Sequence, residues 1–146
     1  MLPSITMKVS LVQTGTMRFE GTTDDGAKTL FHIPPKGEAK EAPSPFQHLA
    51  LSLAACTAAD VASQLEKMRQ RYSRFEIELE YERAKEHPKV MTRAHLTYVF
   101  RGPAIDEEKV TRAIRLSQER YCSISAMVRR AGVELSVAHR IEGEGS

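Results

Sequence analysis

The sequence has no tryptophan, and aromatic residues make up only 6% of its 146 positions. Proteins that bind single-stranded nucleic acid stack the bases on aromatic side chains, so this chain has little material for such a surface. An excess of positive charge is also missing, because 21 Lys and Arg residues stand against 19 Asp and Glu residues, for a formal net charge of +2. So small a charge does not favour binding to a phosphate backbone. We therefore expect no nucleic-acid partner.

Long apolar runs are absent as well. The longest weakly polar stretch, Leu49 to Ala59, covers about half of the roughly 20 residues that a membrane-spanning helix needs, so we expect no membrane partner. Residues 1–8 do not combine a basic segment with an apolar stretch and a small-residue cleavage site, which predicts a cytoplasmic protein. In that reducing compartment a permanent disulfide is not expected, whereas a transient redox pair is compatible with the conditions.

The sequence also lacks the short ligand spacings of metal sites. Its five histidines and two cysteines form no Cys-x-x-Cys or His-x-x-His pattern, so we expect neither a metal nor a cofactor. There is no glycine-rich phosphate-binding loop, and no serine lies in a nucleophile-elbow sequence. The two cysteines, Cys56 and Cys122, are therefore the candidates for chemistry.

The length of 146 residues is that of one domain, which we assign to positions 1–146. Alternation of apolar and polar residues, with a turn signal at Asp24-Asp25-Gly26, predicts three short strands in the first part of the chain. They are expected over residues 5–11, 17–21 and 28–33. The first of them has the pattern of a half-buried strand.

A long helix is expected to begin at Ser44 and Pro45, because serine caps helix N-termini and proline is favoured at the first helical position. Apolar residues at spacings of three and four continue to about Arg71. The first half of this helix is apolar nearly all round, which predicts burial on most sides. Further patterns predict a hairpin, a helix capped by Asp106, a short helix and a last strand, over residues 75–81 with 94–100, 106–117, 123–131 and 133–137.

The two cysteines lie in unlike settings. Cys56 lies in an alanine-rich helix, one turn before Asp60 and one turn after Ser52. It can be read as a small buried apolar residue, since free cysteine is among the most buried residue types. Cys122 precedes the short helix, where unpaired N–H groups and the positive end of the helix dipole favour a thiolate. The alternative for Cys122 is a packing residue in a turn between helices.

Several segments resemble the OsmC/Ohr family, in its OsmC-like branch. They are Pro43-Ser44-Pro45, Leu53-Ala54-Ala55-Cys56-Thr57-Ala58-Ala59-Asp60-Val61, Lys67-Met68-Arg69, Glu82-Arg83-Ala84, His87-Pro88-Lys89-Val90, Arg112-Ala113-Ile114, and Leu116-Ser117 through Tyr121-Cys122-Ser123. The resemblance covers about residues 15–140, and both cysteines fall in the cysteine motifs of the family in the right order.

The resemblance implies an α+β fold in which a long central helix and a second helix pack against antiparallel sheets, in an intertwined homodimer. It also implies a cysteine-based peroxidase, a peroxiredoxin-like oxidoreductase acting on organic hydroperoxides. Cys56 would attack the peroxide, Cys122 would resolve the resulting sulfenic acid as a disulfide, and an external dithiol would reduce that disulfide. The helix-start argument favours Cys122 as the reactive thiol, and we follow the resemblance in assigning Cys56.

The resemblance further assigns Arg18 as the arginine of an N-terminal strand that steadies the departing oxygen. The family commonly has a glutamate, paired with this arginine, at the position of Gln47. Gln47 keeps a hydrogen-bond acceptor and loses the charge. This difference motivates a second hypothesis, a non-catalytic module that binds a hydrophobic ligand or an electrophile. A third hypothesis is a purely structural dimer.

Overall fold

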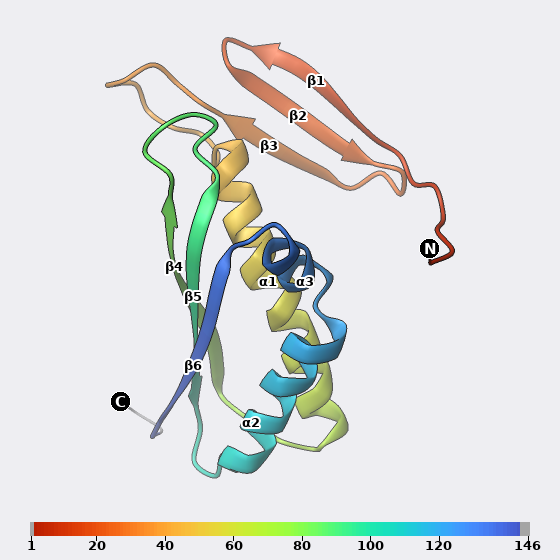
Figure 1. Ribbon diagram of the computed structural model, residues 1–146, viewed down its shortest axis with the longest axis vertical. Coiled ribbons are helices and arrows are strands. Elements are labelled where there is room, and N and C mark those ends of the chain that lie inside the picture. Colours follow the sequence, from red (N-terminus) through yellow and green to blue (C-terminus); the bar gives the residue numbers. More distant parts are fainter. Residues whose placement is uncertain (1, 144–146) are drawn as a thin grey trace. The chain divides into compact units, whose positions relative to one another are not determined.

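The computed structural model describes residues 2–143, which contain two three-stranded sheets and the helices α1 (Pro45–Lys67), α2 (Glu107–Leu116) and α3 (Ser123–Arg130) (Figure 1). This content confirms the α+β class. The chain divides into two compact units, one ending at Leu49 and the other beginning at Ala50. None of the helices in the described part of the chain has both the length and the hydropathy needed to cross a membrane.

The first unit holds an antiparallel sheet in the order β1 (Val9–Gly15), β2 (Arg18–Thr23) and β3 (Lys28–His32). The expected first strand, over residues 5–11, is wrong in its bounds. Val9 pairs with Thr23, which is the last residue of β2, so residues before Val9 have no partner on that strand. Half-burial is also wrong, because every residue of β1 is exposed.

The second unit holds the sheet of β4 (Arg74–Arg83), β5 (Met91–Arg101) and β6 (Glu134–Glu142). The β4–β5 pair is the expected antiparallel hairpin. The β5–β6 pair is parallel, so the expectation of antiparallel sheets is wrong for this pair. The reason is the connection, since α2 and α3 lie between the two strands and a helical crossover returns the chain in the same direction.

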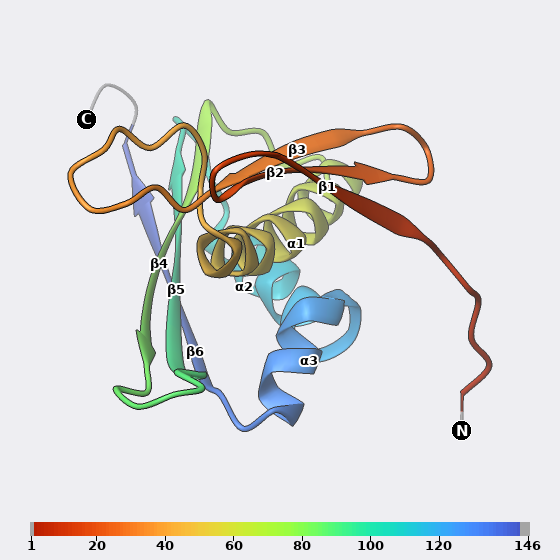
Figure 2. The same ribbon diagram turned by 90° about the horizontal axis from the view of Figure 1, so that it is seen from above.

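The helices α1, α2 and α3 lie on one face of this second sheet (Figures 1 and 2). Their apolar side chains meet those of the central strand β5 in a core without solvent exposure at most positions. The core consists of Val61, Leu65, Leu96, Tyr98, Phe100, Val110, Ala113 and Ile114. Phe75 of β4 stacks on Phe100 with a ring-centre distance of 4.4 Å. Burial of this apolar surface supplies the main stabilising free energy of the unit.

Helix α1 begins at Pro45, as expected, and ends four residues earlier than the spacing of apolar residues indicates. Arg69 has a φ of 56°, a left-handed conformation that cannot continue a helix. The expected burial of its first half on most sides is wrong. Ala50, Leu53 and Thr57 form part of one buried stripe, whereas Leu51 is 57% exposed.

A widened helical turn connects α2 to α3 and fixes the position of Cys122. Asp106 caps α2 as expected, because its side chain accepts a hydrogen bond from the Glu108 N–H. After α2 the chain forms a π-helical turn over Ser117–Tyr121, closed by a 2.8 Å hydrogen bond from the Cys122 N–H to the Ser117 carbonyl. Cys122 is then extended and serves as the N-cap of α3.

Candidate active site

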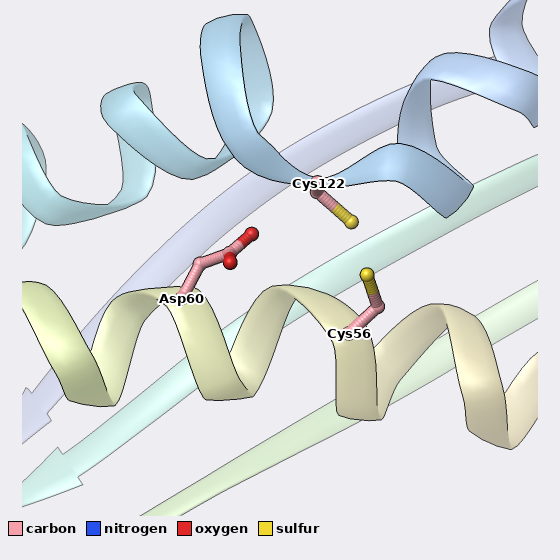
Figure 3. A group of neighbouring side chains, drawn as sticks. All are labelled: Cys56, Asp60 and Cys122. Carbon is pink, nitrogen blue, oxygen red and sulfur yellow. The ribbon is translucent and has the colours of Figure 1, made fainter. Parts of the chain in front are cut away.

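The structure brings the two cysteines together, although they are far apart in the sequence. Cys56 lies in the middle of α1 and Cys122 at the start of α3, and their sulfurs point toward each other (Figure 3). Asp60, one turn further along α1, points its carboxylate toward the same place. One ligand atom from each of these three residues lies within 4.8 Å of those of the other two. Cys122 is buried, and Cys56 is partly exposed.

The first turn of α3 holds both sulfurs. Cys56 receives a hydrogen bond from the backbone N–H of Ile124, and its Sγ lies 3.8 Å from the Ser123 hydroxyl oxygen. The Sγ of Cys122 accepts from the backbone N–H of Ser125 at 3.4 Å and from the Ser125 hydroxyl at 3.1 Å. The N–H groups at a helix start have no partners within the helix, so here they are available to sulfur.

These contacts make Cys56 the more acidic of the two thiols. Burial by itself raises the pKa of Cys56. Hydrogen bonds from the Ile124 N–H, the Cys122 thiol and the Ser123 hydroxyl outweigh it, so that the pKa of Cys56 lies below the ordinary value for cysteine. A thiolate on Cys56 is therefore stabilised by donors that converge on it.

The pKa of Cys122 changes in the opposite direction. Burial raises it, and the two hydrogen bonds from Ser125 do not offset the combined effect of burial and the neighbouring Cys56. The expectation from the helix start alone, which favours a Cys122 thiolate, therefore does not match the net pKa shifts. That expectation was wrong because the sequence does not show how deeply Cys122 is buried. It also does not show that the Ile124 N–H donates to Cys56.

A buried chain of hydroxyl groups leads from β5 to Asp60. The Ser117 hydroxyl donates to Oδ2 of Asp60 at 3.0 Å. A carboxylate only accepts, so the Ser117 oxygen is left to accept from Thr57 (2.7 Å), and Thr57 in turn accepts from the Tyr98 hydroxyl (2.6 Å). The Gln118 amide nitrogen donates to both Thr57 and Tyr98. Hydrogen bonds in such a series strengthen one another, and the last of them, from Ser117, orients the Asp60 carboxylate.

Sequence reasoning missed this network. Thr57 occupies a position in the apolar stripe of α1, and Ser117 lies on the inner face that continues from α2, so both look like packing positions. The one available signal is the polar character of two fully buried positions, since buried hydroxyl groups need partners. Their partners lie on other elements and are not visible from local spacing.

Arg18 lies on β2, in the first unit, and has a carboxylate partner from a loop. Its Nε donates to Glu41 at 2.8 Å, and Nη1 donates to the Thr14 hydroxyl at 2.8 Å. The Arg18 guanidinium lowers the pKa of Glu41, through the hydrogen bond and through its charge. The backbone N–H of Glu41 donates to Nδ1 of His32 at 3.0 Å, which fixes the loop. Sequence reasoning gave Glu41 no role.

Gln47 serves the start of α1. The backbone N–H of Ser44 donates to Oε1 of Gln47 at 3.0 Å, and the backbone N–H of Gln47 donates to the Ser44 hydroxyl at 3.3 Å. This reciprocal pair is a capping box. Lys40 also donates to Oε1 of Gln47. The structure thus brings Cys56 and Cys122 together, and it gives Arg18 and Gln47 separate partners within the first unit.

Comparison with known proteins identifies a family for this chain. The family described as OsmC-like protein matches residues 37–138. Protein YhfA of Escherichia coli K12 is 34% identical over 102 residues, which cover 70% of this chain and 74% of YhfA.

Solved structures share the fold. The crystal structure of a hypothetical protein from Aquifex aeolicus VF5 is 26% identical, with a TM-score of 0.82 and coverage of 97% of this chain and 99% of that chain. The organic hydroperoxide resistance protein OhrB of Bacillus subtilis is 22% identical, with a TM-score of 0.59 and coverage of 93% and 98%.

Because the pKa of Cys56 is lowered and that of Cys122 is raised, we predict that Cys56 is alkylated at lower pH than Cys122. The thiolate is the reactive form, and a lowered pKa maintains a thiolate fraction at pH values where Cys122 is protonated. Iodoacetamide labelling of the reduced protein over a pH series, followed by mass spectrometry of each cysteine peptide, measures this. Ser123→Ala should move the Cys56 profile to higher pH, whereas Ser63→Ala on the exposed side of α1 should leave it unchanged. Labelling of Cys122 at the lower pH would contradict the assignment.

Proposed function

Because the chain belongs to the OsmC-like protein family, we propose that it is a thiol-dependent peroxidase that reduces organic hydroperoxides. The observation that carries this proposal is the pairing of a partly exposed, acidified Cys56 thiol with a buried Cys122 thiol. A peroxidatic thiol needs to be ionised and reachable, and it needs a second thiol nearby for resolution. The name of the similar Bacillus subtilis protein, which refers to organic hydroperoxide resistance, supports this substrate class.

In the first step the Cys56 thiolate attacks one oxygen of the peroxide bond. The O–O bond breaks, Cys56 becomes a sulfenic acid, and the other oxygen leaves as an alkoxide that takes up a proton to form the alcohol. The sulfur is oxidised by two electrons and the peroxide is reduced by two. Hydrogen bonds from Ile124 and Ser123 stabilise the thiolate before the attack.

In the second step Cys122 attacks the sulfenic sulfur of Cys56. A disulfide forms, and the hydroxyl group leaves as water with the proton of the Cys122 thiol. The raised pKa of Cys122 suits this order, because Cys122 stays protonated while Cys56 meets the peroxide. An external dithiol then reduces the disulfide by thiol–disulfide exchange and is itself oxidised, which restores both thiols.

We assign Arg18 the role of the cation that stabilises the departing oxygen, as the family resemblance implies. Its local geometry supports a fixed orientation, since Glu41 and Thr14 hold two different nitrogens of the guanidinium. Glu41 supplies the carboxylate that Gln47 lacks. We therefore propose Glu41 as the residue that positions Arg18, and Gln47 as a residue that serves only the helix start.

We also propose that the protein acts as a homodimer, in which both units of the chain form one functional domain. Each unit exposes apolar side chains that a second copy would cover. On the edge strand β1 these are Val9, Leu11 and Val12, and in the second unit they are Leu51, Tyr121 and Met127. Edge strands and exposed apolar groups of this size are typical of interaction surfaces.

Cumene hydroperoxide should be consumed in the presence of dithiothreitol by the wild-type protein and not by Cys56→Ser, which loses the attacking sulfur. Without dithiothreitol, Cys122→Ser should consume about one equivalent of peroxide per chain and accumulate a sulfenic acid on Cys56 that dimedone traps. Peroxide loss and mass spectrometry measure the two outcomes. Glu66→Gln, an exposed change on α1, should behave as wild type. Equal consumption by wild type and Cys56→Ser, or a sulfenic acid found only on Cys122, would overturn the proposal.

Arg18→Ala should lower kcat/KM for the hydroperoxide by about 10²–10³-fold, which is the range for removing one charge-stabilising donor. Glu41→Gln should give a smaller loss, because it removes only the partner of Arg18. In the Arg18→Ala background, Glu41→Gln should have no further effect, since it acts through Arg18. Glu38→Gln, in the same loop, is the matched control. Independent losses from Arg18→Ala and Glu41→Gln would contradict the positioning role.

The wild-type protein should have a mass in solution of about twice the 16.4 kDa of one chain. Leu51→Glu should shift it toward the monomer, because a charge would replace an exposed apolar contact. Light scattering after size-exclusion chromatography measures the mass. Val90→Glu changes an apolar residue of similar exposure in the β4–β5 connection and should leave the mass unchanged. A wild-type monomer would refute the dimer.

A further inference from the structure

Three potential metal ligands surround one point in the second unit. Cys56, Asp60 and Cys122 each contribute one ligand atom, and these atoms lie within 4.8 Å of one another (Figure 3). Their spacing in the sequence does not reveal this set. Only Cys56 and Asp60 are neighbours on a helix, and Cys122 comes from another element.

We propose that the reduced protein binds a zinc ion through Cys56, Asp60 and Cys122. This site goes beyond the proposed peroxidase function and does not depend on it. Two thiolates and one carboxylate are ligands that zinc accepts, and thiolate ligands disfavour magnesium and calcium. Three protein ligands leave the fourth tetrahedral position open to water.

The ligand geometry needs only a small adjustment. Zinc binds sulfur at about 2.3 Å, so two sulfurs of a tetrahedral site lie about 3.8 Å apart. The present separations are below 4.8 Å, and rotation of side chains can supply the difference. Cys56 and Asp60 are partly exposed, which gives an ion a route from solvent.

Contacts around the ligands orient them in the way that metal sites require. Ser117 donates to Oδ2 of Asp60, which leaves Oδ1 of this carboxylate for an ion. Ser117 is itself fixed by the buried chain through Thr57 and Tyr98. Partners of this kind hold ligating carboxylates and are worth about 10–100-fold in metal affinity.

The charge of Asp60 supports a cation at this point. The Asp60 carboxylate points toward the same place as the two sulfurs, so two thiolates and this carboxylate would bring three negative charges together and would repel one another. A divalent cation placed between the three groups converts that repulsion into attraction. The position of Asp60 therefore fits a site that holds a cation when both cysteines are reduced.

The test is a titration of the reduced full-length protein with Co²⁺, followed by the sulfur-to-cobalt charge-transfer absorption. We expect saturation at one ion per chain and loss of the band when Zn²⁺ is added, because zinc binds such sites more tightly than cobalt. Cys56→Ser combined with Cys122→Ser, or alkylation of both thiols by iodoacetamide, should abolish the band. No peroxide is present, so failure of the peroxidase proposal leaves this result unaffected.

Two further variants identify the carboxylate and its support. Asp60→Asn should raise the Kd for Co²⁺ at least 10-fold, and Ser117→Ala should raise it about 10–100-fold while the band is retained. Glu66→Gln, which removes a charge from the same helix outside the site, should leave the Kd unchanged. The proposal is overturned if the wild-type protein shows no charge-transfer band, if one ion binds per two chains, or if folded Asp60→Asn keeps wild-type affinity.

Discussion

The hydrogen-bond donors at the start of α3 are the constraint on which the thiol site depends. A helix leaves the N–H groups of its first turn without partners inside the helix, and buried ones must be satisfied elsewhere. Here sulfur accepts them, with Ile124 serving Cys56 and Ser125 serving Cys122. The π-helical turn before Cys122 makes this arrangement possible, because it ends α2 and leaves Cys122 extended as the cap of the next helix. The start of α3 thus contacts both sulfurs, and its hydrogen bonds help to lower the pKa of Cys56, whereas burial and the neighbouring Cys56 keep the pKa of Cys122 raised.

The site also rests on a rigid polar base within the core. Tyr98, Thr57 and Ser117 are fully buried, and their hydroxyl groups satisfy one another before the series reaches Asp60. Gln118 completes the network through its amide nitrogen, although its Oε1 has no partner in the described part of the chain. An unsatisfied buried acceptor costs about 1–3 kcal/mol, so the two bonds made by the amide nitrogen help to offset that cost. Burial also raises the pKa of Tyr98, which keeps its hydroxyl protonated as a donor.

Local features of the sequence predicted the helices and most strands well, and they predicted poorly which strands and side chains contact one another. Ser44-Pro45 and Asp106 marked helix starts correctly, because capping depends on residues close in sequence. The bounds of β1 and the parallel β5–β6 pair were wrong, because both depend on a partner strand. The cysteine pair was predicted by a family resemblance, and its acidity order was not predicted by the helix start. Gln47 was placed at the position of the family glutamate that pairs with Arg18, yet the capping box of Gln47 and the pairing of Arg18 with Glu41 emerge only from the folded loop.

The parallel pairing of β5 and β6 has a consequence for how the thiols can move. Cys122 lies in the connection between β5 and β6, which are adjacent strands of one sheet. Because the sheet holds both ends of this connection, the connection cannot move as freely as a terminal segment can. The movements left for joining the sulfurs are therefore rotations of the Cys56 and Cys122 side chains and small shifts within this connection, because the two ligand atoms already lie within 4.8 Å.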